Sequence, residues 1–383
     1  MFDIERFDKF SVPSPCFVVD ESALRGNLEI LADIRRRSGA KILLALKAFA
    51  MFDQFPLIRQ FLDGTCASGL YEARLGREDF QKEVHTFSPA YTEEEFKDIL
   101  AFSDHIVFNS FSQWERFKPI CLESTDHRRF GLRINPEHSE AEVALYDPCA
   151  PKSRLGIRRS QFEGKDLAGI TGLHFHVLCE QNADALERTA RAVEARFGDL
   201  LPNFEWMNFG GGHHITRRDY DRNLLCRLIS KFRETHDVEV FLEPGEAAAL
   251  NAGVLVATVQ DLVRNETGIA ILDVSATCHM PDVLEMPYRP DIDGAGLPGE
   301  KPHTFRLAGP SCLAGDVIGD YSFDRPLRVG DRLLFMDMAH YTMVKTTMFN
   351  GVKHPSIAAW NPGEDPVRIV RRFSYEDYRS RLG

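Results

Sequence analysis

Apolar and polar residues alternate in blocks along the first two thirds of the chain. Short apolar runs, such as those within residues 42–46, 105–110 and 238–245, have the length and composition of parallel strands that are buried on both faces. The segments between them place apolar residues at helical spacing, for example across residues 182–197 and 218–235. This alternation predicts a parallel sheet built from repeated strand–helix units.

Eight such strands are expected, at residues 40–49, 64–68, 84–89, 105–110, 129–136, 170–177, 206–212 and 238–245. Eight strands over about 220 residues match the size of a (β/α)8 TIM-type barrel, and a doubly wound sheet is the alternative. The barrel is favoured because the unusual residues all end their strands: Lys47, His176, Gly210 to Gly212, and Glu243. In a barrel these ends form one rim, where active sites are built.

The pattern changes after residue 245. Strand-like segments at 253–263, 268–274, 303–309, 316–323 and 331–338 are separated by Gly, Pro and Asp turns and have few helical periods. They predict a second, mostly β domain. A strand at residues 16–19 precedes the first barrel helix and can join this domain, so we expect a barrel at 22–250 and a discontinuous β domain at 1–21 and 251–383.

Composition narrows the classes of function. The net charge of -11 argues against nucleic acid binding and favours cationic small molecules. No apolar run reaches the length of a membrane span, and the first residues do not resemble a signal peptide, so we expect a cytoplasmic protein with no membrane partner. The eight cysteines include no CxxC pair, which argues against a zinc ribbon or a disulfide framework.

Lys47 is the most unusual residue, because it ends an apolar run in which an ammonium group is costly to bury. A desolvated lysine amine is nucleophilic and can bond covalently to a carbonyl compound. Two structural explanations compete with this one. The side chain can extend out of the strand end, or it can pair with a carboxylate.

Three other features lie on the same predicted rim. Gly210, Gly211 and Gly212 follow a strand and precede a helical pattern, so they form either a phosphate-binding turn or simply a tight turn. Glu243 ends a buried strand before Pro and Gly, where a carboxylate is typically functional or paired. His174 and His176 face the same side of their strand, and either can also be a core histidine.

Taken together, a lysine, a glycine turn, a flat histidine and a buried carboxylate are the groups that a pyridoxal phosphate site needs. The lysine attaches the cofactor, the turn holds its phosphate and the histidine packs on its ring. A carboxylate facing the ring nitrogen keeps that nitrogen protonated and makes the ring a strong electron sink. Glu243 therefore favours decarboxylation over racemisation.

Six motifs in this order carry a family resemblance: LALKAF, GLHFHV, NFGGG, LEPGE, GPSCLAGD and DMAHYT. The chain resembles the fold-type III pyridoxal phosphate decarboxylases, which have an alanine-racemase-like barrel and a β domain and act as homodimers with composite active sites. Within this family it is similar to the branch that decarboxylates carboxynorspermidine or carboxyspermidine in polyamine synthesis.

The resemblance implies a role for each matching residue. Lys47 is the covalent anchor, His176 stacks on the cofactor, Gly210 to Gly212 bind its phosphate, Glu243 holds its ring nitrogen and Tyr341 lies near the phosphate. In the β domain, Cys312 is expected to reach the partner subunit's site and reprotonate the decarboxylated carbon. Asp316 is expected to bind the distal amine of the substrate.

The chain departs from the ornithine and diaminopimelate enzymes in two places. Leu178-Cys179-Glu180 replaces their Gly-Ser after the stacking histidine, and Glu246 replaces the arginine after Glu-Pro-Gly. An acidic site suits the ammonium groups of a carboxylated triamine. Glu246, with Asp282 and Glu285, is therefore expected to bind substrate, although the last two also fit a solvated acidic loop.

Other functions stay open at this point. The substrate can be another diamino acid of the diaminopimelate or ornithine type, and a pyridoxal-binding protein without catalysis is a further alternative. A metal-dependent hydrolase would have to use His174, His176, His213 and His214, but these cluster on only two strands. No metal is expected, because catalytic metal ligands in a barrel converge from several strands.

Overall fold

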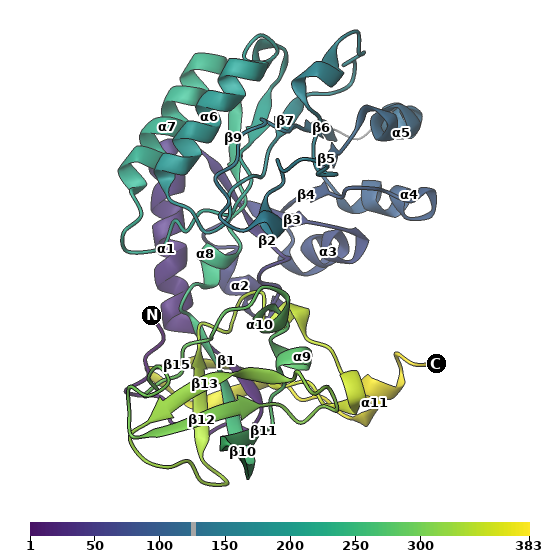
Figure 1. The fold of residues 1–383 in the computed structure, drawn as a ribbon. Helices are drawn as coiled ribbons and strands as arrows, with labels where there is room; N and C mark the ends of the chain where they lie inside the picture. The colour runs from purple at the N-terminus through teal and green to yellow at the C-terminus, as the bar shows by residue number, and fades with distance from the viewer. Residues whose placement is uncertain (124–127) are drawn as a thin grey trace. The chain divides into compact units, whose positions relative to one another are not determined.

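The computed structural model describes residues 1–123 and 128–383, apart from the side chains of residues 364–366. It divides into two compact units (Figure 1). One comprises Asn27–Ala248, and the other combines Met1–Gly26 with Ala249–Gly383.

The unit Asn27–Ala248 is built on a closed barrel of parallel strands, which pair in chain order from β2 to β9. The strands are β2 (Lys41–Ala45), β3 (Gly64–Ala67), β4 (Glu83–Phe87), β5 (His105–Phe108), β6 (Arg129–Arg133), β7 (Gly172–His174), β8 (Trp206–Asn208) and β9 (Glu239–Leu242). β9 pairs with β2 and closes the ring. The predicted barrel is confirmed. The alternative prediction of a doubly wound sheet is wrong, because such a sheet has two unpaired edge strands whereas here β9 pairs with β2.

Helices alternate with the barrel strands, and the longer ones lie on the outside of the barrel (Figure 1). They are α1 (Glu21–Ser38), α2 (Phe55–Ile58), α3 (Leu70–Leu75), α4 (Glu93–Phe102), α5 (Phe111–Glu123), α6 (Ala183–Phe197), α7 (Arg222–His236) and α8 (Glu246–Ala249). Thr92 caps α4 by accepting a hydrogen bond from the Glu95 amide at 3.2 Å, as the capping pattern predicts. Between β6 and β7 the described chain forms a long loop with only short 3-10 turns.

The interior of the barrel is filled by large side chains at its middle level. Trp206 packs with Leu43, Val107 and Phe241 in one buried cluster. A Cβ atom at Gly172 would lie 2.1 Å from the Trp206 ring. Glycine is therefore needed where the indole crosses the barrel, and the interior below the rim is packed.

The other unit is a twisted β-sheet with strand order β13-β12-β11-β10-β1-β15-β16, and β14 also pairs with β10. The strands are β1 (Cys16–Asp20), β10 (Gly253–Asn265), β11 (Thr267–Leu272), β12 (His303–Ala308), β13 (Val317–Phe323), β14 (Arg332–Met336), β15 (Ser356–Asn361) and β16 (Glu364–Arg371). β1 runs antiparallel to β10 and parallel to β15. The predicted completion of this sheet by the N-terminal strand is confirmed, whereas β15 and β16 were not predicted.

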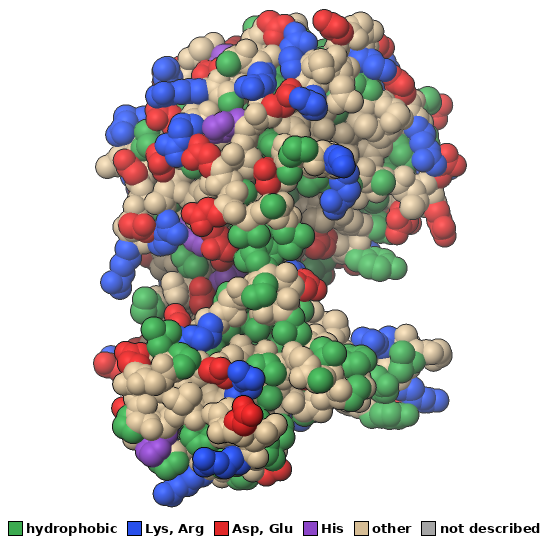
Figure 2. Space-filling view, viewed as in Figure 1, with side chains coloured by type: hydrophobic (Ala, Val, Ile, Leu, Met, Phe, Trp, Pro, Cys, Tyr) green, Lys and Arg blue, Asp and Glu red, His purple; other side chains and the backbone are tan. Residues whose placement is uncertain are grey.

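Three short helices belong to the same unit: α9 (Ala276–His279), α10 (Asp282–Glu285) and α11 (Tyr375–Arg379). Among the described residues, none of the helices is both long enough and apolar enough to cross a membrane. On the face drawn in Figure 2, basic and acidic side chains are interspersed over the barrel surface.

Candidate active site

The barrel brings together side chains and a glycine turn that follow four different strands. Lys47, His176 and Glu243 come shortly after β2, β7 and β9, and the glycine turn follows β8. The Lys47 Nζ lies 3.4 Å from the His176 Nε2. The Gly211 amide donates a hydrogen bond to the His176 Nδ1 at 2.9 Å, and the Glu243 amide donates to the Gly210 carbonyl at 2.8 Å. The predicted rim residues therefore form one site.

Lys47 differs from the expectation in one respect. β2 ends at Ala45, and Lys47 lies in the turn that follows, with an exposed side chain. The expectation of a buried lysine is wrong, because the chain leaves the sheet before this residue. Its amine is nevertheless directed at His176, so it faces the site.

His176 is held as a neutral ring. Burial lowers its pKa well below the ordinary value, and the positive charges of Lys47 and Arg133 lower it further. Because the Gly211 N–H donates to Nδ1, the proton of the neutral ring is assigned to Nε2. A neutral, oriented imidazole has the flat face that stacking on another ring requires.

The glycine turn is dictated by close backbone packing. A Cβ atom would lie 2.5 Å from the Phe175 carbonyl oxygen if placed on Gly210, 2.2 Å from the Glu243 carbonyl oxygen on Gly211, and 1.9 Å from the Leu178 carbonyl oxygen on Gly212. Gly210 and Gly212 also have φ values of +67° and +82°. No other residue type fits these positions without moving the backbone.

Only part of this turn is available to bind an anion. The Gly210 amide donates to the Asn208 Oδ1 at 2.8 Å and the Gly211 amide donates to His176. Among the described residues, the Gly212 amide has no hydrogen-bond acceptor. The helix expected after the turn is α7, which begins at Arg222, so a loop separates the glycines from its first turn.

Glu243 carries a largely buried, ionised carboxylate, 12% exposed. Its Oε1 accepts a hydrogen bond from the Asn208 Nδ2 at 2.7 Å, and its Oε2 lies 3.4 Å from the His174 Nε2. Burial alone raises the pKa of Glu243, but His174 and Asn208 outweigh it and lower the pKa to about 2. The carboxylate therefore keeps its negative charge at neutral pH.

Three further residues contribute to this site and are not predicted to do so from the sequence. Asn208 and His174 hold the Glu243 carboxylate, and His174 is therefore more than a core histidine. Arg133, at the end of β6, is buried, donates to the His176 carbonyl at 2.9 Å and lies over the Phe87 ring. The sequence does contain a signal for Arg133. Like Lys47, it is a charged residue at the end of an apolar run.

Glu246 lies close to the rim at the start of α8. Its Oε2 is 3.2 Å from the His214 Nε2, a close contact that falls short of hydrogen-bond geometry. His213 is buried separately and pairs with the Tyr220 hydroxyl at 2.6 Å. His174, His176, His213 and His214 thus each have a different neighbour, which does not suit a shared metal ion.

The β unit carries the other predicted residues. Cys312 is exposed, and its amide donates to the Asn350 Oδ1 at 2.8 Å. Asp316 is only 3% exposed. Its carboxylate accepts hydrogen bonds from the Ser275 hydroxyl and the Ala276 amide, both at 2.8 Å, and from the Ser311 amide at 3.2 Å. Asp316 thus organises the loop that presents Cys312.

Three further residues complete the predicted set. Tyr341 is half-buried after β14, with φ of +46°. Asp282 and Glu285, on α10, both face Lys345, at 2.5 Å and 3.7 Å from its Nζ. Their negative charge is partly balanced by that lysine.

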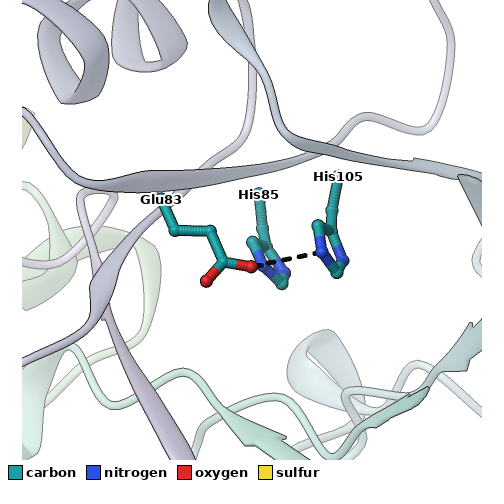
Figure 3. Close-up of side chains that lie close together, drawn as sticks. All are labelled: Glu83, His85 and His105. Atoms are coloured by element: carbon teal, nitrogen blue, oxygen red, sulfur yellow. Dashed lines mark hydrogen bonds and ion pairs between the residues drawn. The ribbon is translucent and has the colours of Figure 1, made fainter. Parts of the chain in front are cut away.

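A separate polar cluster occupies the amino-terminal end of the barrel (Figure 3). The Glu83 Oε1 lies 3.0 Å from the His85 Nε2 and 3.2 Å from the His105 Nε2. These atoms are close enough to be considered as metal ligands. However, the two rings stack 3.8 Å apart at 14°, so their in-plane lone pairs do not converge. Together with Lys41, 3.5 Å from the Glu83 Oε2, they form a balanced hydrogen-bond network.

A family model described as "Pyridoxal-dependent decarboxylase, C-terminal sheet domain" matches residues 16–339. The chain belongs to the pyridoxal-dependent decarboxylases. It is an enzyme of this family, and its cofactor is pyridoxal phosphate.

Relatives in this family match nearly the full chain. Carboxyaminopropylagmatine decarboxylase of Synechocystis sp. is 48% identical over 97% of this chain and 96% of its own length. Carboxynorspermidine/carboxyspermidine decarboxylase of Campylobacter jejuni is 43% identical over 97% of this chain and 98% of its own. The crystal structure of carboxynorspermidine decarboxylase from C. jejuni, complexed with norspermidine, has a TM-score of 0.89 at 42% identity and covers 97% of this chain and 100% of that one.

The residues of the decarboxylase site suit pyridoxal phosphate. Glu243 offers an anion for the ring nitrogen, His176 offers a neutral ring and the Gly212 amide is an open donor for a phosphate oxygen. The exposed amine of Lys47 is accessible to the aldehyde. The donor set therefore fits the cofactor that the family uses.

Proposed function

We propose that this decarboxylase acts on a carboxylated triamine, carboxynorspermidine or carboxyspermidine, and releases CO2 with norspermidine or spermidine. The observation that carries the reaction type is the ionised Glu243 beside Lys47 and His176. When bound, pyridoxal phosphate supplies an electron sink, which an anion at its ring nitrogen strengthens. The C. jejuni enzymes, at 42% and 43% identity, support the substrate class.

In this proposal each rim residue has one task. Lys47 would hold the cofactor covalently through its amine until the substrate amine takes its place. His176 packs its neutral face on the ring, and Asn208 and His174 keep the Glu243 carboxylate aimed and ionised. The Gly212 amide would donate to the phosphate, and Tyr341 stays a prediction as a residue near the phosphate.

Glu246 is proposed to bind an ammonium group of the substrate. Its carboxylate is partly buried and faces His214, so an ammonium group placed there is attracted with little screening by water. Asp282 and Glu285 are weaker candidates because Lys345 already faces both. Asp316 stays a prediction as a ligand of the distal amine, and we propose that its first task is to hold the Cys312 loop.

The active enzyme is proposed to be a homodimer in which Cys312 of one subunit enters the site of the other. The exposed Cys312 thiol would give its proton to the α-carbon after CO2 leaves, and solvent would then reprotonate the thiolate. A composite site of this kind explains why an exposed cysteine lies on a loop fixed by buried hydrogen bonds. The enzyme is also proposed to be cytoplasmic.

Carboxyaminopropylagmatine is a second candidate substrate, because the Synechocystis relative that decarboxylates it is 48% identical to this chain. It ends in a guanidinium group, whereas carboxynorspermidine and carboxyspermidine end in ammonium groups. Both ends are cationic and suit Glu246. The guanidinium favours a planar, two-point contact with a carboxylate.

The deciding experiment measures CO2 release by the cofactor-loaded enzyme on carboxynorspermidine, carboxyspermidine, carboxyaminopropylagmatine, diaminopimelate and ornithine side by side. We expect the two carboxylated triamines to have the highest kcat/KM. A preference for carboxyaminopropylagmatine would establish the second candidate, and a preference for diaminopimelate or ornithine would refute both.

A variant tests the proposed substrate contact. Glu246→Gln should raise the KM for the triamine roughly ten- to a hundredfold, because a charged hydrogen bond is worth about 1.5 to 3 kcal/mol, while kcat changes little. Glu285→Gln is the matched control and should change KM by less than about threefold. Equal effects in the two variants would contradict the assignment of Glu246.

A further inference from the structure

A large cavity opens in the barrel unit away from the residues of the candidate active site. Its volume is about 1010 Å³, which is large enough for a small molecule. It is lined by the residues that follow β5 and β6, the first turn of α5 and the loop between β6 and β7. Lys47, His176, the glycine turn and Glu243 are not among its lining residues.

The lining of this cavity is strongly cationic. It includes Lys152, Arg154, Arg158 and Lys165 but only one acidic residue, Glu137. This composition is unusual in a chain whose net charge is -11. The ammonium groups of a polyamine would be repelled here, which argues against a role for these cations in holding the amine groups of the substrate.

Two of these cations have no counter-ion of their own. Arg158 pairs with Glu137, and Lys165 pairs with Glu115 at 2.9 Å. Within the described part of the chain, the side chains of Lys152 and Arg154 make no hydrogen bond or ion pair. Their charges are therefore available to a bound anion.

The first turn of α5 adds uncharged donors to the same cavity. Ser110, Phe111 and Ser112 line it, and α5 is a regular helix running to Glu123. The amide of Gln113 is capped by the Ser110 hydroxyl at 3.1 Å. The amides of Phe111 and Ser112 have no acceptor among the described residues, so the positive end of the helix faces the cavity.

We propose that this cavity binds a small polyanion, carrying two or more phosphate or carboxylate groups, between Lys152, Arg154 and the first turn of α5. More than one anionic group is required because the unpaired cations and the helix end approach the cavity from different elements. The bound molecule is distinct from the cofactor, whose candidate residues lie elsewhere on the rim.

A chain of hydrogen bonds connects this cavity to the active site. The Ile157 amide donates to the Arg133 carbonyl at 2.8 Å, and the Asn135 amide donates to the Ile157 carbonyl at 2.9 Å. Arg133 in turn donates to the His176 carbonyl. If the chain has the proposed decarboxylase function, a molecule bound in the cavity should therefore change kcat. This effect on kcat is tested separately from binding.

Titration calorimetry on the cofactor-loaded enzyme tests the site, with inorganic pyrophosphate and citrate as probes of the two anion chemistries. We expect one site per chain, with affinity that falls as NaCl is raised. Cofactor absorbance recorded in parallel should stay constant, which shows that the probe has not displaced the cofactor. No binding of either probe at millimolar concentration would overturn the proposal.

A pair of double variants locates the site. Lys152→Gln with Arg154→Gln should weaken binding at least about tenfold. Arg227→Gln with Lys231→Gln removes the same charge from exposed residues of α7 and should leave the affinity within about twofold. Equal weakening in both double variants would show a general charge effect and refute the site. A change of oligomeric state in the first double variant alone would instead show that a partner chain covers the cavity. Because binding is measured without substrate, failure of this proposal leaves the decarboxylase assay unaffected.

Discussion

Replacing Glu243 with glutamine removes a charge while keeping the shape of the side chain. A glutamine Oε1 can still accept the hydrogen bond from Asn208, which measures 2.7 Å. Its amide group can donate to the His174 Nε2 once the imidazole carries its proton on Nδ1, an atom that has no hydrogen-bond partner among the described residues. The variant should therefore fold and bind cofactor.

The size of the effect follows from the pKa of Glu243. The shift from 4.5 to about 2 is about 2.5 units, and each unit corresponds to about 1.36 kcal/mol, so the site favours the ionised carboxylate by about 3 kcal/mol. This contribution to stability is present above pH 4.5 and is lost as the pH falls toward 2. Glu243→Gln should lower the free energy of unfolding at pH 7 by up to about 3 kcal/mol.

The same charge acts on the reaction. If the transition state loses a comparable 3 kcal/mol, kcat falls roughly a hundredfold. The assay is CO2 release at saturating substrate and cofactor, with bound cofactor checked by absorbance. Glu83→Gln is the matched control, because Glu83 is also a partly buried carboxylate with a lowered pKa but lies at the opposite end of the barrel. It should lose stability and keep kcat within about threefold of the wild-type enzyme.

The outcome separates catalysis from folding. A kcat for Glu243→Gln within about threefold of wild type, with cofactor bound, would refute the proposed role of the carboxylate. An equal loss of kcat in Glu83→Gln would show that stability alone explains the effect.

Three other predictions concern single residues. Lys47→Ala should abolish turnover and prevent borohydride from fixing pyridoxal to the chain. Mixing the Lys47→Ala and Cys312→Ala variants should restore part of the activity through heterodimers. If no activity returns, the two subunits do not share a site. Gly211→Ala should weaken cofactor binding by at least about tenfold, because its Cβ would lie 2.2 Å from the Glu243 carbonyl oxygen; an unchanged cofactor Kd would show that the turn can relax. His213 is buried and burial lowers its pKa from 6.5 to about 3, so the unfolded state binds more protons between these values and stability falls as the pH drops below 6.5. His213→Gln should remove about 2 kcal/mol of that loss at pH 5, measured by urea unfolding at pH 5 and 7, and the same acid loss in both proteins would contradict this account.

Much of the fold follows from local patterns. Buried parallel strands produce continuous apolar runs, and all eight barrel strands were predicted within a few residues from that signal. The N-terminal strand was placed in the β sheet because it precedes the first barrel helix. β15 and β16 were missed.

Within the site, the sequence by itself determined the chemical types of the rim residues and the strands that they follow, because a charge or a glycine run after an apolar strand is a local signal. Only the tertiary structure decided which groups touch. The contacts of Glu243 with His174 and Asn208 join different strands, and they set its pKa, a property of three-dimensional surroundings. The exposure of Lys47 depends on the point at which the chain leaves β2. The hydrogen bonds of the glycine amides also depend on the folded chain: the Gly210 amide donates to Asn208 within the turn, and the Gly211 amide donates to His176, which is distant in sequence. Spacing along the chain names the candidates, whereas burial and distance between strands determine their charge and their partners.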